Sequence, residues 1–207
     1  SLKMLLDELR EESSELIPLS CEDIVNVISQ HLQCKKASRL PVLVVAAAYM
    51  VAEKKLGEKV LNLNPHNAAD EQTGAAGDVE ITLTSEDKVL TSYEMKMKAV
   101  TKGDIEIALK KIAAHPGIRN YIFITTDTID PDVREYAAKM YQETGGVEIA
   151  ILDCIGFIRH FLHLFPRLRT DFLNNYQKLV IDEPESAVSH ALKEAFLALR
   201  HSAEAVS

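Results

Sequence analysis

The stretch GDVEITLTSEDKVLTSYEMKMK, residues 77–98, contains two short alternating runs around a polar turn. Residues two apart in a strand share a face, so a strand over the second run points Glu94, Lys96 and Lys98 the same way. Asp78 and Glu80 share a face of the first run for the same reason. The segment SEDK between the runs suits a hairpin, which would bring the two sets of charges together.

Pairing these two strands places Asp78 beside Glu94, with Lys96 at the rim. Two carboxylates that close repel each other unless a cation lies between them. Proteins bind Mg²⁺ through one or two carboxylates and leave it several waters. A neighbouring lysine can then orient an attacking water or stabilise charge on a scissile phosphate. The structural alternative is a solvated hairpin face on which Glu94 and Lys96 form cross-strand ion pairs.

Hydrophobic periodicity and capping signals predict the elements that must position these residues. Ser20, followed by Asp23, is a near capping box, and Gly57 is a helix stop. Helices are expected over 4–17, 20–32, 38–57, 102–117, 130–146, 155–180 with a break near Pro166, and 184–205. Strands are expected over 59–64, 78–84, 89–100, 120–126 and 147–153. The order is helices, then β-β-β, then α-β-α-β, then helices. This order predicts an α/β (α+β) fold with a mixed sheet.

The spacing of Asp78, fifteen further residues and then Glu94-Met95-Lys96 resembles the bipartite motif of the PD-(D/E)xK nuclease superfamily. That superfamily shares an α-β-β-β-α-β core, which the elements from 38 to 127 match. Gly77 stands where the motif has proline. More narrowly, RLPVLVVAAAYMVAEKKLGEKV followed by GDVEI and YEMKMK is similar to type II restriction endonucleases of the SacI-like group.

This resemblance implies a Mg²⁺-dependent DNA endonuclease, with flanking helices at both ends of the core. Asp78 and Glu94 would hold the metal with help from Glu53 on the preceding helix, and Lys96 would assist the attacking water. Residues 1–207 would form a single nuclease-like domain: a helical extension (1–37), the catalytic core (38–152) and C-terminal helices (153–207). The chain opens on Ser1 instead of Met, which leaves room for a longer natural protein.

Further residues are weaker candidates. Glu80 is a second acid or a solvated residue, and Lys98 is a phosphate contact or simply exposed. DNA contacts are considered at His66 and Asn67 in the polar loop and at Arg159, Arg167 and Arg169 among the C-terminal helices, against connector and solvated-surface roles. His160 and His163 have metal-compatible spacing, but no further ligand is near them in the sequence, so packing or surface roles are favoured.

The formal charge of −8 seems to oppose nucleic-acid binding, because phosphate contacts need Lys and Arg. Residues 1–23 carry net −5 and residues 181–207 net −3, so the segment between them is neutral. A basic groove on that neutral segment is compatible with double-stranded DNA as the partner. Recognition of a palindromic site would then call for a homodimer.

The composition indicates the cellular environment in which the protein is expected to fold. Hydrophobic residues make up 47% and charged residues 26%, and the longest apolar run, residues 40–52, is too short to cross a membrane. Three widely spaced cysteines favour free thiols in a reducing cytoplasm, and the acidic start has no signal-peptide pattern. Two alternatives stay open: another nuclease of the same core, such as a junction resolvase or repair enzyme, and a non-catalytic α/β interaction domain.

Overall fold

The computed structural model describes residues 1–11, 17–66 and 74–206. Its elements follow the expected order. They are α1 (Leu2–Glu11), α2 (Cys21–Leu32), α3 (Leu40–Leu56), β1 (Glu58–Val60), β2 (Val79–Leu83), β3 (Thr91–Lys96), α5 (Lys102–Ala114), β4 (Asn120–Thr125), α6 (Pro131–Glu143), β5 (Glu148–Asp153), α7 (Cys154–Leu164), the 3₁₀ helix η1 (Pro166–Leu168), α8 (Arg169–Asp182) and α9 (His190–Val206).

The five strands form one mixed sheet in the order β1-β2-β3-β4-β5. The first three strands are antiparallel, and β3, β4 and β5 are parallel to one another. Helix α5 connects β3 to β4, and α6 connects β4 to β5, as parallel neighbours require. The predicted mixed α/β fold is confirmed, and β3 is the middle strand of the sheet.

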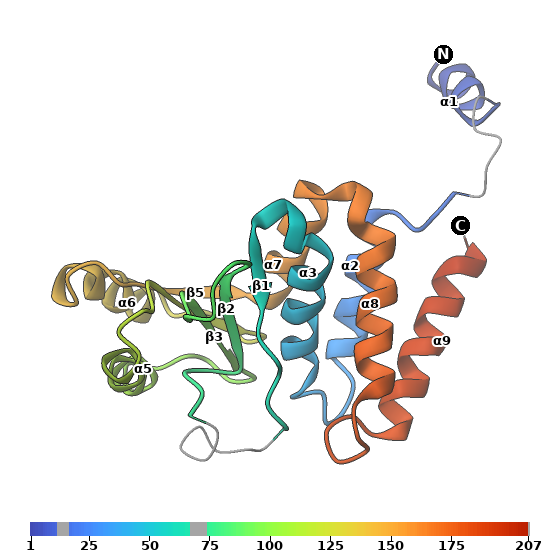
Figure 1. The fold of residues 1–207 in the computed structure, drawn as a ribbon. Coiled ribbons are helices and arrows are strands. Elements are labelled where there is room, and N and C mark those ends of the chain that lie inside the picture. Colours follow the sequence, from blue (N-terminus) through green and yellow to red (C-terminus); the bar gives the residue numbers. More distant parts are fainter. Residues whose placement is uncertain (12–16, 67–73, 207) are drawn as a thin grey trace.

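Helices cover both faces of the sheet (Figure 1). On one face α5 and α6 pack against alternate residues of the central strands, such as Tyr121 and Phe123. On the other face α2, α3, α7, α8 and α9 form the larger core, which includes Val79, Tyr93 and Ile124 of the sheet. Because side chains alternate along a strand, β4 supplies both cores, with Tyr121 and Phe123 on one face and Ile124 on the other.

The N-terminal helices show how local signals set their ends. The Ser20 hydroxyl accepts from the Asp23 N–H, and the Asp23 carboxylate accepts from the Ser20 N–H, both at 3.0 Å, which completes the predicted capping box. Gly57 ends α3 in the left-handed conformation, with φ of 67°. Ser38 was expected to begin α3, but the residue at the cap is Arg39, and Pro41 lies in the first turn.

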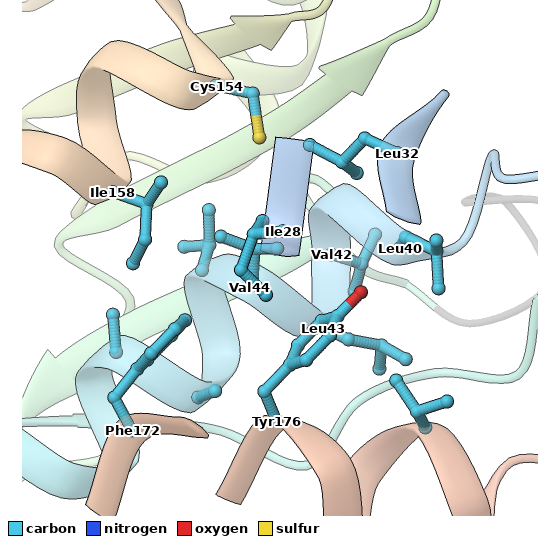
Figure 2. Packing of buried hydrophobic residues seen from close by; sticks show 14 of the residues in the cluster. Ile28, Leu32, Leu40, Val42, Leu43, Val44, Cys154, Ile158, Phe172 and Tyr176 are labelled. Atoms are coloured by element: carbon cyan, nitrogen blue, oxygen red, sulfur yellow. The ribbon is translucent and has the colours of Figure 1, made fainter. Parts of the chain in front are cut away.

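Helix α3 is the centre of the larger core. Its residues Leu40 to Ala48 are all buried, so it is apolar around its whole circumference. Figure 2 shows Phe172 and Tyr176 of α8 pointing towards this helix. Tyr49, one residue further along α3, places its hydroxyl 2.6 Å from that of Tyr93 on β3. The sheet is thereby fixed to the helical layer at the strand that carries Glu94 and Lys96.

No helix in the described ranges is both long and apolar enough to span a bilayer. All three cysteines are free, Cys154 is buried, and Cys21 and Cys34 are partly buried. Burial raises the pKa of the Cys154 thiol to about 12.

Candidate active site

The charged face of β3 lies inside the sheet, not at its edge. Glu94 and Lys96 point to the layer of α5, opposite Tyr93, which packs into the larger core. The Glu94 side chain is only 16% exposed, because β4 flanks it and α5 covers it. The expectation that Glu94 and Lys96 share one face is confirmed. A solvated hairpin edge does not describe this position.

Asp78 lies just before β2, beside Glu94. Its N–H donates to the Tyr93 carbonyl at 2.9 Å, and its Oδ2 accepts from the Met95 N–H at 2.8 Å. The two contacts therefore reach the residues on either side of Glu94. Continuing the register beyond the pair Val79–Tyr93 also puts Asp78 opposite Glu94. The hairpin thus brings together the two acids of the motif, while their joint metal binding remains a prediction.

Gly77 explains why the motif has no proline in this chain. A Cβ at this position would lie 2.3 Å from the Ser92 Oγ and 2.7 Å from the Tyr93 carbonyl oxygen. The backbone before Asp78 approaches β3 too closely for any side chain. A glycine at this position is therefore a steric requirement of this hairpin.

Two residues far along the chain hold the Glu94 carboxylate. The Lys111 ammonium, from α5, lies 3.2 Å from Oε1, and the Tyr121 hydroxyl, from β4, donates to Oε2 at 2.6 Å. The Tyr121 hydroxyl also lies 3.3 Å from the Ala76 carbonyl oxygen, which places Glu94 next to the segment that leads into Asp78. Charge-assisted hydrogen bonds of this kind fix the orientation of a carboxylate.

Lys96 pairs with Asp104 at 3.2 Å. Asp104 belongs to the capping box of α5, in which its carboxylate accepts from the Thr101 N–H. Burial opposes the ionisation of Asp104, but the Thr101 N–H and the Lys96 ammonium outweigh it and hold the pKa of this carboxyl below its usual value. A negative charge at the start of α5 therefore holds the ammonium of Lys96 beside the site.

The donor set fits a cation of the Mg²⁺ type in its chemistry. Asp78 and Glu94 supply hard carboxylate oxygens, and each carboxylate has lone pairs beyond those used by its hydrogen bonds. Across the described ranges, however, no three acidic, histidine or cysteine side chains gather as a metal-binding group. Glu53 does not join Asp78 and Glu94, because α3 packs on the opposite face of the sheet. The residues present therefore offer two carboxylates to a metal.

The other predicted residues near the hairpin have structural contacts. Glu80 accepts from the Ala76 N–H at 3.3 Å, and Lys98 is exposed after the end of β3. Asn67 lies outside the described residues.

His66 lies between the start of α3 and the hairpin. Its Nε2 is 3.3 Å from the Ser38 hydroxyl. Burial, and then the Arg39 guanidinium, lower the pKa of His66. The carboxylates of Glu183 and Asp78 act in the opposite direction. His66 therefore lies close enough to Asp78 for that carboxylate to affect its pKa.

The arginines predicted to contact DNA lie on the other side of the molecule. Arg159 pairs with Glu22 at 3.1 Å, and Arg169 donates to the Leu19 and Pro166 carbonyls at 2.9 and 2.8 Å. His163 also contacts Glu22, at 2.7 Å. These contacts join α7 and α8 to the start of α2. Arg167 is exposed.

A model of the SacI restriction endonuclease C-terminal domain family matches residues 17–126, which is 110 of the 207 residues. The chain belongs to this family. The matched segment runs from just before α2 to the end of β4, and so contains every residue that contacts Asp78, Glu94 and Lys96 in the preceding paragraphs. Arg159, Arg167 and Arg169 lie beyond it. No curated protein matches the chain.

The spacing of Asp78, Glu94 and Lys96 in the sequence does not indicate which other residues contact them. Lys111 follows Glu94 by 17 residues and Tyr121 follows it by 27, with no short motif joining them. For Asp104 the sequence contains a partial signal. Thr101 and Asp104 have the spacing of a capping box, which predicts the start of a helix but not the ion pair of Asp104 with Lys96.

Proposed function

We propose that this chain is a Mg²⁺-dependent DNA endonuclease of restriction type, with the catalytic arrangement of the PD-(D/E)xK superfamily. The observation that supports this activity is the placement of Asp78 beside Glu94 on the middle of the sheet, with Lys96 two residues further along. All three lie within the segment matched by the restriction endonuclease family. We further propose that it acts on double-stranded DNA as a homodimer.

Each residue has a role that follows from its contacts. Asp78 and Glu94 would hold Mg²⁺, which supplies positive charge beside the scissile phosphate. Lys111 and Tyr121 orient the Glu94 carboxylate, and so act as positioning residues. Lys96, held by Asp104 in this structure, would turn its ammonium towards the phosphate or the attacking water once DNA is bound.

The test is cleavage of a mixture of plasmids, in Mg²⁺ and in EDTA. Wild type should give discrete bands in Mg²⁺ only, and Lys96→Ala should reduce the rate by about 10²–10³-fold, as loss of one charge-stabilising donor typically does. Glu94→Gln should abolish cleavage. Lys139→Ala is the matched control, because Lys139 forms an exposed ion pair with Glu135 on α6, and it should cut as wild type does.

Cleavage that persists in Glu94→Gln, or no cleavage by folded wild type with either Mg²⁺ or Mn²⁺, would refute the proposal. The second case would favour a non-catalytic interaction module. One observation already favours that alternative: Asp78, Glu94 and Lys96 all have partners inside the protein. A module of that kind would bind its partner equally well after Glu94→Gln.

A further inference from the structure

Helix α1 presents an apolar stripe that the other described residues of the chain do not cover. Leu2, Leu5, Leu6 and Leu9 recur at the i, i+3, i+4, i+7 spacing of one helix face, yet none of them is buried. Exposed fractions range from 45% to 72%. In Figure 1 this helix stands apart from the other elements. A helix of ten residues is marginal alone in water, so it needs a surface to pack on.

An open apolar groove lies on the helical layer, with a volume of about 400 Å³. Its walls come from α3, the end of β5 and α7, and they are mostly hydrophobic. Leu56, Leu152 and Leu164 line it, and their exposed fractions are 40%, 38% and 60%. Phe157 and Phe161 of α7 form its floor with Tyr49 of α3. A cavity of this size accommodates several side chains from a helix.

The connection between the two surfaces is short. The chain that follows α1 is anchored beside α7, because Arg169 holds the Leu19 carbonyl and the Cys21 thiol contacts the Leu162 carbonyl at 3.4 Å. Seven residues, 12–18, separate α1 from Leu19, which allows a reach of about 25 Å. Helix α7 has 11 residues and is about 16 Å long. The whole groove is therefore within reach of α1 of the same chain.

Charge does not oppose this docking. The polar face of α1 carries Asp7, Glu8 and Glu11 together with Lys3 and Arg10, and the groove lining includes Asp153 as well as Arg134 and His160. Both surfaces thus carry charges of both signs, and the apolar contact is the main favourable term.

We propose that α1 docks into this groove of its own chain, with Leu5 and Leu9 as its apolar anchors. A tether of this length gives an effective concentration in the millimolar range, well above that of a second copy in dilute solution. The groove lies on the α3 and α7 side of the sheet, whereas Glu94 faces α5. Docking is therefore independent of the proposed nuclease activity.

The protein has no tryptophan, so a single one reports on the groove. In Leu164→Trp, docked α1 should shield the indole and move its emission to shorter wavelength. Adding Leu5→Asp and Leu9→Asp should reverse that shift and increase quenching by acrylamide. These two leucines are exposed in the structure, so the added charges should not unfold the protein. Leu197→Trp, exposed on α9 and outside the groove, is the control and should not respond.

Dilution identifies the source of the helix. Docking within one chain predicts an emission that is unchanged over a hundredfold range of protein concentration. A shift that disappears on dilution means that a second copy supplies α1, and it refutes docking within the chain. Emission of Leu164→Trp that is insensitive to Leu5→Asp and Leu9→Asp refutes docking of α1 altogether.

Discussion

Gly77→Ala is the sharpest test of the hairpin that carries Asp78. The added Cβ would lie 2.3 Å from the Ser92 Oγ and 2.7 Å from the Tyr93 carbonyl oxygen, against about 3.5 Å for an ordinary contact. The serine hydroxyl can rotate away, but the carbonyl belongs to the backbone of the middle strand. The two strands must therefore move apart, which separates Asp78 from the Met95 N–H.

Overpacking of this kind costs about 1–3 kcal/mol of unfolding free energy. For a chain of this size that lowers the melting temperature by roughly 2–12 °C. Gly103→Ala provides the matched control, since its nearest neighbour would be the Thr101 Oγ1 at 3.6 Å and alanine favours a helix. It should be neutral or slightly stabilising. Gly77→Pro carries the same Cβ, so restoring the proline of the motif should destabilise at least as much.

A double variant separates the two clashes. The Ser92 Oγ is buried and makes no hydrogen bond within the described part of the chain, so Ser92→Ala alone should cost little. Combined with Gly77→Ala it removes the 2.3 Å contact and leaves the 2.7 Å contact with Tyr93, so the rescue should be partial. Thermal unfolding of the four proteins measures this. Equal melting temperatures for Gly77→Ala and Gly103→Ala would show that the close approach at Gly77 is wrong.

Three further outcomes are expected from urea unfolding. Lys111→Met should destabilise by about 1–3 kcal/mol, because it leaves the largely buried Glu94 carboxylate without its cation. Glu94→Gln in the same chain should restore much of the loss. Lys139→Met, which removes an exposed ion pair, should change the free energy of unfolding by under about 1 kcal/mol. Equal effects of Lys111→Met and Lys139→Met would contradict the role of Lys111 as the cation that pairs with Glu94. Leu43→Ala should cost about 2–5 kcal/mol in the core shown in Figure 2, and a smaller cost would mean looser packing.

The third outcome concerns pH. Burial lowers the pKa of His31 from its ordinary 6.5, although the Leu192 carbonyl acts in the opposite direction. Below pH 6.5 the unfolded chain therefore binds more protons than the folded chain. The contribution of neutral His31 to the free energy of unfolding is complete above that pH. It decreases by up to about 1.4 kcal/mol per pH unit as the pH falls towards the lower pKa of the folded state. His31→Gln should remove that slope, and an unchanged slope would assign the acid sensitivity to other groups.

Local signals were sufficient for the elements but not for the site. The capping box at Ser20 and the stop at Gly57 use neighbouring residues, so the sequence shows them directly. The alternation in residues 89–100 correctly divides β3 into an apolar and a charged face. The alternating pattern continues through Met97 and Lys98, but these two residues are not part of the strand pairing, so β3 ends at Lys96.

Contacts between distant residues could not be predicted in this way. Arg159 is of a residue type that often contacts DNA phosphates, but its partner in the structure is Glu22, 137 residues earlier in the chain. Glu53 was expected to join Asp78 because the nuclease superfamily that the sequence resembles often adds an acid from the helix before the sheet. That helix instead packs on the face of Tyr93, and which face a helix covers depends on the whole chain.

Glu94 is a charged residue at a position that an apolar residue could fill. A carboxylate and an ammonium lose several kcal/mol each when they leave water, and their attraction in a protein interior repays this only in good geometry. Apolar side chains of similar volume would fill the space between β3 and α5 without that cost, as Phe123 does on the next strand. Strand β3, the middle strand of the sheet, nevertheless carries Glu94 and, at its end, Lys96, and α5 supplies Lys111 and Asp104 opposite them. We propose that β3 carries these charges because the proposed reaction would use them.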